Sequence, residues 1–273
     1  MGRNCVANQS VRLGQHAVLT LPCDRGGLRL HAPLAIDTPS PIPNPPRPPH
    51  MSWTIYRHYK GNHYLRLGVG AHSEDLSPHV VYRCLYDNPE ARTWIRPQGM
   101  FAETLEDGRL RFTPEARMRL VQPEDCPAVL AFGYDAWGEG KTLAEFVAGY
   151  DHSRNHQRGT RYLLETLAGV PVAGLNTLRF RRGLMGLASV ATDPAQRGKG
   201  YSALLVRAAM ELQRFSHGDL RFLLFSEVPP SVYERHGFHV LPPEHQRFLP
   251  SVAMATGDTP LSVAEAEFLK AYF

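Results

Sequence analysis

The chain has 273 residues, of which 43% are hydrophobic, so it can supply ordinary apolar cores but is too long for one small domain. Its formal charge of +4 is mild and its basic residues are spread along the chain, so we expect no nucleic-acid partner. The cysteines form no C-x-x-C pair or zinc pattern, and no apolar run could span a bilayer or serve as a secretory signal. The sequence therefore predicts a cytoplasmic protein with reduced thiols, no metal site and no membrane partner.

Residues 1–50 have the composition of a tail rather than of a folded domain. Prolines are dense between residues 33 and 49, and such a run favours extended polyproline conformation and builds no core. Two interpretations are open: a disordered proline-rich linker or docking peptide, or a mis-assigned start with Met51 as the true first residue. We favour the second, because the pattern of a folded domain begins at Trp53.

Residues 51–114 predict a small β-rich domain. Short apolar stretches at 56–69, 80–86 and 94–101 are separated by turn-forming residues, which suggests a barrel-like or curled sheet. The segments Tyr-Arg-His-Tyr-Lys-Gly-Asn at 56–62, His-Ser-Glu at 72–74, Val-Tyr-Arg at 81–83 and Trp-Ile-Arg-Pro at 94–97 resemble a small bacterial domain family of unknown function. That resemblance implies a fold unit without an established activity.

From residue 115 to residue 273 the pattern becomes mixed α/β. A strand at 119–121 precedes two short predicted helices, at 128–137 and 143–150. Strands follow at 162–167, 171–180 and 184–191, then a helix at 201–215, a strand at 220–225 and a short helix that ends at Tyr233. Two tail strands are predicted at 238–240 and 252–254.

The junction before the long helix carries the clearest chemical signal. Residues 197–202 read Arg-Gly-Lys-Gly-Tyr-Ser and run directly into that helix. Two glycines let backbone N–H groups converge without interference from Cβ atoms, and the first helical turn adds unpaired donors and a partial positive charge. Arg197 and Lys199 add full charges, so the turn predicts an anion site, preferably for a pyrophosphate.

This turn resembles the acetyl-CoA loop of GNAT-type N-acetyltransferases, which reads Arg/Gln-x-x-Gly-x-Gly/Ala. Arg197 and Gly200 match, and Ser202 replaces glycine or alanine with a residue that is still small. Further along, residues 233–238 read Tyr-Glu-Arg-His-Gly-Phe, which is similar to the family's Tyr-Glu-x-x-Gly-Phe helix end. The resemblance covers the chain from about residue 118 onward and implies a GNAT-like domain with a central, mostly antiparallel sheet.

The resemblance also implies roles for individual residues. Acetyl-CoA is the implied acyl donor, and its pyrophosphate would lie on Arg197, Gly198, Lys199, Gly200, Tyr201 and Ser202. Its pantetheine amides would pair with the strand end formed by Leu187, Ala188, Ser189 and Val190. In the family this strand carries a bulge and splays from the next strand. A backbone N–H near Val190 would then polarise the thioester carbonyl.

Four side chains are candidates for the reaction itself. Tyr233 matches the family's general acid, which protonates the departing thiolate; a packed helix-end aromatic is the alternative. Glu227 is the candidate base, although an exposed turn carboxylate is its default interpretation. Tyr134 and Trp137 are candidate substrate-binding residues, because they lie in the predicted helices that would wall the acceptor pocket.

These expectations describe an acetyl-CoA-dependent N-acetyltransferase that acts on an amine of a small molecule or peptide, as a monomer or homodimer. The alternative is a non-catalytic adaptor that binds CoA, RNA or a protein. The acceptor itself stays open at this point, because the sequence admits a small amine, an amino acid, an antibiotic or a protein N-terminus.

Overall fold

The computed structural model describes residues 51–151, 153, 157–181 and 183–270, and the backbone alone of four short strands nearer the N-terminus. Those strands form two antiparallel pairs, β1 (Gln9–Arg12) with β2 (Val18–Leu21) and β3 (Cys23–Asp24) with β4 (Gly27–Leu28). The proline run at residues 33–49 lies outside the described residues, so both interpretations of it stay predictions. The chain divides into two compact units, Met1–Arg119 and Leu120–Phe273.

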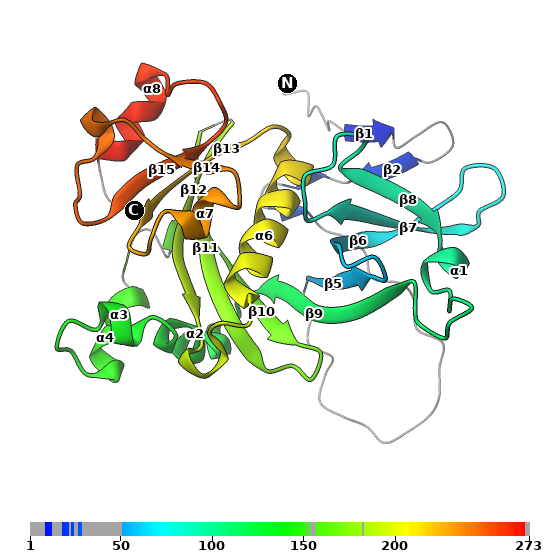
Figure 1. The fold of residues 1–273 in the computed structure, drawn as a ribbon, viewed down its shortest axis with the longest axis horizontal. Coiled ribbons are helices and arrows are strands. Elements are labelled where there is room, and N and C mark those ends of the chain that lie inside the picture. The colour runs from blue at the N-terminus through cyan, green and yellow to red at the C-terminus, as the bar shows by residue number, and fades with distance from the viewer. Residues whose placement is uncertain are drawn as a thin grey trace, which may run out of the picture. The chain divides into compact units, whose positions relative to one another are not determined.

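The first unit contains an antiparallel sheet with strand order β9-β5-β6-β7-β8 (Figure 1). Its strands are β5 (Ser52–His58), β6 (His63–Ala71), β7 (Pro78–Cys84), β8 (Thr93–Pro97) and β9 (Phe112–Leu120). A short helix, α1 (Gln98–Phe101), adds Phe101, whose ring stacks on Phe112 with the centroids 4.2 Å apart. Within the described pairings β8 and β9 do not meet, so this β-rich unit is an open sheet rather than a closed barrel.

The second unit is mixed α/β, as predicted, and its strand order is β14-β15-β13-β12-β11-β10. The strands are β10 (Thr160–Thr166), β11 (Pro171–Arg181), β12 (Leu184–Thr192), β13 (Arg221–Ser226), β14 (Phe238–Val240) and β15 (Val252–Thr256). Among the described pairings of this unit, only β12 and β13 run parallel. The predicted mostly antiparallel sheet is therefore confirmed.

Helices α2 (Cys126–Ala131) and α6 (Tyr201–His217) cover opposite faces of β10 and β11 (Figure 1). Gly174 of β11 faces α2, because a Cβ at Gly174 would lie 2.5 Å from Cγ1 of Val129. The next residue on β11 pairs with Tyr162, whose hydroxyl accepts a 2.8 Å hydrogen bond from Gln213 of α6. Successive strand residues point to opposite faces, so the two helices lie on the two sides of the sheet.

One predicted helix is interrupted. The helix expected at 128–137 is α2 followed by a separate turn, α3 (Tyr134–Trp137), and then by α4 (Leu143–Asp151). The break falls at Gly133, where the absence of a side chain lets the Trp137 indole lie against the backbone. The strand expected at 119–121 is also only the end of the longer β9. No helix in the described part of the chain is long and apolar enough to cross a bilayer.

Candidate active site

Strand β12 is distorted where the sequence analysis placed the pantetheine contacts. Gly174 of β11 pairs with Ala191, but Asn176 pairs with Ala188, so β12 contains one more residue than β11 over this interval. That extra residue is a β-bulge, and Ser189 within it has a φ of +51°. Left-handed backbone is uncommon for residues other than glycine and is concentrated at functional sites. The bulge that the family resemblance implied is confirmed.

The pairing of β12 with β13 ends before the bulge is reached. Their parallel pairing covers only Leu184 with Arg221, Met185 with Phe222 and Gly186 with Leu223. Both strands continue further, β12 to Thr192 and β13 to Ser226, so they diverge after Gly186. The edge of β12 that faces β13 is thus left for another extended chain to pair with, as in recognition by strand addition.

The glycine-rich turn follows β12 directly and leads into α6. Gly198 and Gly200 have φ values of +79° and +82°, which explains the choice of glycine at both positions. A Cβ at either glycine would meet no atom within 4 Å, so the space in front of the turn is open. No side chain caps the first turn of α6, which starts with Tyr201 and Ser202. Helix N-termini of this kind bind anions through backbone N–H groups and the helix dipole.

The two cations of the turn are used differently. The Arg197 guanidinium binds both carboxylate oxygens of Asp135, at 2.6 and 2.8 Å, and also donates to the carbonyl oxygens of Phe132 and Thr192. These bonds lower the pKa of Asp135 and fix the turn to α3. The Lys199 ammonium is 2.8 Å from the neutral Gln196 amide oxygen, a contact that does not cancel its charge. In this conformation Arg197 holds the turn, and Lys199 is the cation better placed for an anion.

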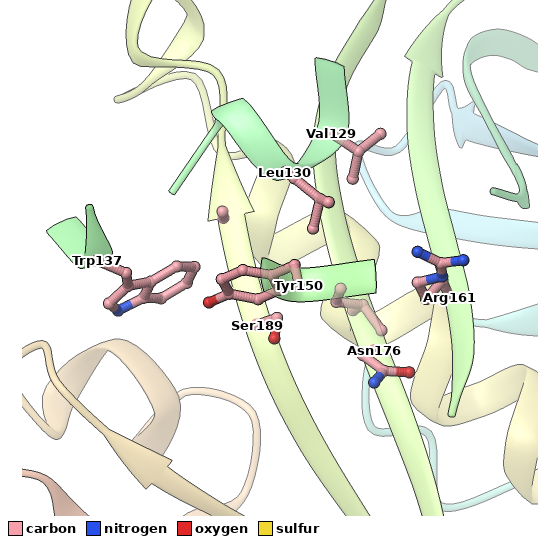
Figure 2. Close-up of a pocket in the computed structure, with 9 residues that line it drawn as sticks. Val129, Leu130, Trp137, Tyr150, Arg161, Asn176 and Ser189 are labelled. Atoms are coloured by element: carbon pink, nitrogen blue, oxygen red, sulfur yellow. The ribbon is translucent and has the colours of Figure 1, made fainter. Parts of the chain in front are cut away.

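A pocket of about 350 Å³, counting the part open to solvent, lies on the α2 face of the sheet. Arg161 pairs with Asn176 and Ala191 pairs with Gly174, so their side chains share that face. In Figure 2 the Trp137 and Tyr150 rings lie beside Ser189, while Arg161 and Asn176 lie toward the other end. The surface that faces the pocket is almost wholly apolar, although polar residues are among its members, which are Val129, Leu130, Trp137, Tyr150, Arg161, Leu175, Asn176, Ser189 and Ala191.

Two candidates from separate parts of the sequence meet at the aromatic end of this pocket. The Trp137 indole N–H donates a hydrogen bond to the carboxylate of Glu227, which follows β13. Burial, together with the negative charges of Glu227 and Glu139, raises the pKa of the Tyr150 phenol to about 12. Glu227 is therefore near both rings, and Tyr150 stays neutral at physiological pH.

Tyr134 and Tyr233 lie in other surroundings. The Tyr134 hydroxyl donates to the carbonyl oxygen of Lys141 at 2.6 Å, and its ring packs against Phe146; it does not belong to the described lining of the pocket. Tyr233 lies in α7 (Ser231–Glu234), where it is buried with its ring edge-on to Phe238. The role of each tyrosine stays a prediction.

Helix α7 is tied to α6 by one arginine. Arg207 of α6 donates from Nε to Nδ1 of His236 at 3.1 Å, and from a terminal nitrogen to the carbonyl oxygen of Arg235. Burial, together with the charges of Arg207 and Arg235, lowers the pKa of His236 to about 4. A neutral imidazole accepts this hydrogen bond, so the link fixes the segment after Tyr233 to the helix that starts at the glycine turn.

Sequence reasoning missed three residues of this region: Asp135, Arg161 and Asn176. Asn176 offered a signal, because it is a polar residue inside the apolar stretch at 171–180, and in the structure it is 1% exposed. Asp135 and Arg161 offered none, because their places depend on a contact between α3 and the turn and on the register of β10 against β11.

Comparisons with known proteins agree with the sequence resemblances. The model of the family described as "Protein of unknown function (DUF1653)" matches residues 54–114, which confirms the resemblance of that segment. A search of curated proteins found no match.

Solved structures of acetyltransferases match the second unit. One is a chimera of the spermidine N-acetyltransferase SpeG from Vibrio cholerae and hSSAT (14% identity, 52% of this chain and 94% of that chain, TM-score 0.43). A second is a GNAT family N-acetyltransferase from Escherichia coli in complex with CoA (20% identity, 52% of this chain and 81% of that chain, TM-score 0.40). A third is an IAA acetyltransferase from Bacillus cereus (18% identity, 52% of this chain and 98% of that chain, TM-score 0.37). Likenesses this distant say nothing about the activity or ligands of this chain.

Proposed function

We propose that the second unit, residues 120–273, is an acetyl-CoA-dependent N-acetyltransferase. The observation that carries this proposal is the sequence of features along β12 and α6: a bulge at Ser189, divergence from β13, and then a turn with two left-handed glycines. The diverging strand edge suits an extended chain of amides, and the turn suits a diphosphate. Acetyl-CoA carries both groups, with the thioester at the amide end.

The residues of the turn fit the diphosphate. Gly198 and Gly200 leave open space before the uncapped N–H groups of α6, and Ser202 is small enough for close approach of a phosphate. Lys199 supplies a charge at this position, while Arg197 keeps the turn in place through Asp135. The pantetheine amides would pair with the strand end formed by Leu187, Ala188, Ser189 and Val190, which keeps the thioester beside the bulge.

The reaction then needs three actions from the protein. A backbone N–H at the bulge, near Val190, stabilises the oxyanion that forms when the amine nitrogen attacks the carbonyl carbon. Tyr233 gives its proton to the sulfur as the C–S bond breaks, so the thiol leaves neutral, and the phenolate takes up a proton from solvent before the next turnover. The proton lost by the amine passes toward Glu227, directly or through water. The products are an acetylated amine and CoA, and no covalent enzyme intermediate is formed.

Binding of the donor is the first test. Acetyl-CoA should raise the melting temperature of the protein, and a concentration 100-fold above the dissociation constant should add about 2.7 kcal/mol to the stability. Gly200→Glu should remove this shift, because it places a side chain and a negative charge in the turn. Gly169→Glu is the matched control, since Gly169 has nearly the same φ, +81°, and equally open surroundings in the β10–β11 hairpin. Equal binding by both variants would contradict the assignment of the turn.

Transfer is the second test. The protein should release free CoA thiol from acetyl-CoA when a suitable amine is added, and the rate should differ from one amine to another. Binding of acetyl-CoA with no thiol release in the presence of any amine tested would instead support the non-catalytic CoA-binding adaptor.

A further inference from the structure

The chemistry of the pocket on the α2 face specifies the kind of amine that could fill it. Its walls are apolar side chains from α2, notably Val129 and Leu130, and its aromatic end is formed by Trp137 and Tyr150 (Figure 2). The bulge residue Ser189 lies in the same lining, so a group bound here is next to the position where the acetyl carbon is expected.

The charge at the aromatic end is negative. Glu227 accepts the indole hydrogen bond of Trp137, and its charge, together with that of Glu139, acts on the Tyr150 phenol. The Glu227 carboxylate beside the Trp137 indole forms favourable surroundings for an ammonium group, which is attracted both by the charge and by the aromatic ring. The same carboxylate repels a ligand that carries its own carboxylate next to the amine.

Glu227 also lies at the end of β13 where this strand has diverged from β12. Pairing between β12 and β13 stops at Leu223, and Glu227 follows the end of β13 at Ser226. An amine between Glu227 and the bulge would thus lie between the carboxylate that attracts it and the strand that presents the thioester. Its body would extend into the apolar part of the pocket below α2.

We propose that the acceptor is a primary amine on an apolar, preferably aromatic, body without a carboxylate, held at Glu227 with its body in the pocket between Trp137, Tyr150 and Val129. This inference rests on the proposed function and narrows its substrate class. The proposal excludes α-amino acids, because the Glu227 carboxylate would repel their carboxylate, and it excludes polyamines, because a second ammonium would lie against apolar walls. The rival is an amino-acid acceptor whose carboxylate reaches Arg161 at the far end of the pocket.

Matched pairs of amines test the proposal. Phenethylamine and phenylalanine differ by one carboxylate, phenylalanine amide removes the charge of that group, and pentylamine and 1,5-diaminopentane differ by a distal ammonium. We expect kcat/KM for phenethylamine to exceed that for phenylalanine by about 100-fold, with phenylalanine amide between them. Pentylamine should exceed the diamine by about tenfold or more. Equal or reversed preferences in the first pair would overturn the proposal in favour of recognition at Arg161.

The Glu227→Gln variant tests the source of the selectivity. It should reduce the ratio between phenethylamine and phenylalanine by about tenfold, because the charge that repels the carboxylate is gone. Glu244→Gln is the control, since Glu244 is an exposed carboxylate in a turn of the same unit, whereas the carboxylate that accepts the hydrogen bond of the pocket residue Trp137 belongs to Glu227. An unchanged ratio in Glu227→Gln would overturn the role of Glu227.

Calorimetric titration of the wild-type protein with phenethylamine, with and without CoA, separates failure of this inference from failure of the proposed function. Binding of phenethylamine but not of phenylalanine supports the pocket assignment even if no transfer occurs. Acetyl-CoA binding together with no phenethylamine binding overturns the pocket assignment and leaves the donor site intact.

Discussion

Replacing Gly133 with alanine should weaken amine binding without affecting the donor site. A Cβ at this position would lie 2.2 Å from Cε3 and Cζ3 of Trp137, whereas ordinary contacts begin near 3.4 Å. The indole must therefore move by about 1.2 Å, the difference between these two distances. The backbone of Gly133 has φ −104° and ψ 3°, which alanine can adopt, so the effect comes from the ring and not from strain in the chain.

A displacement of this size breaks the hydrogen bond from the indole to Glu227. Hydrogen bonds to charged groups contribute about 1.5–3 kcal/mol when they are protected from water. The Glu227 carboxylate is exposed, so about 1 kcal/mol is the appropriate magnitude, which corresponds to roughly a fivefold change in affinity. We expect KM for phenethylamine to rise by about five- to tenfold, with the dissociation constant of acetyl-CoA unchanged within about twofold.

Gly149→Ala is the control for this experiment. Gly149 lies in α4, and a Cβ there would meet nothing within 4 Å. Alanine is favoured over glycine inside a helix by about 0.5–1 kcal/mol, so this variant should melt at a higher temperature and keep the wild-type KM. The reasoning is refuted if Gly133→Ala leaves KM for the amine unchanged while the protein remains folded, or if Gly149→Ala raises KM equally.

Two further predictions concern α7 and the segment after it. Tyr233→Phe should lower kcat by about 100- to 10,000-fold and leave acetyl-CoA affinity unchanged, and normal turnover would remove Tyr233 from the mechanism. His236 has a pKa lowered to about 4 in the folded protein, so between pH 6.5 and pH 4 the unfolded chain binds a proton that the folded chain does not. Stability should therefore fall across this window as pH decreases, by at most about 2–3 kcal/mol because the imidazole is partly exposed. His236→Asn supplies an oxygen near the position of Nδ1 for Arg207. The free energy of unfolding, measured with urea at pH 7 and at pH 4.5, should fall less between these two pH values in this variant than in the wild type. An equal fall would exclude His236 as its cause.

The order of elements in the second unit could be predicted from the sequence because each element carries its own local pattern. The tail strand predicted at 238–240 coincides with β14, and the helix predicted at 201–215 lies within α6. The helix predicted at 128–137 continues past the end of α2, because no residue near Gly133 in the sequence indicates that the Trp137 ring lies against its backbone.

The candidate site could be predicted only where its residues form a contiguous motif. The glycines of the turn are visible because left-handed backbone selects glycine, whereas Ser189 adopts a left-handed conformation without any sign in its residue type. The contacts of Arg197 with Asp135 and of Trp137 with Glu227 join residues 62 and 90 positions apart. Such pairs depend on strand register and helix packing, which hydrophobic periodicity does not specify.

In the proposed mechanism, strand β12 serves donor and acceptor at once because it is irregular. A regular strand paired with β11 and β13 along its whole length would have both edges occupied and would leave none for an extended ligand. The extra residue at the bulge increases the local twist, and the pairing with β13 is already lost at that level while pairing with β11 resumes at Ala191. The left-handed Ser189 costs about 1–3 kcal/mol and persists because β11 holds the strand on both sides of it. The strain is thus maintained by the sheet itself.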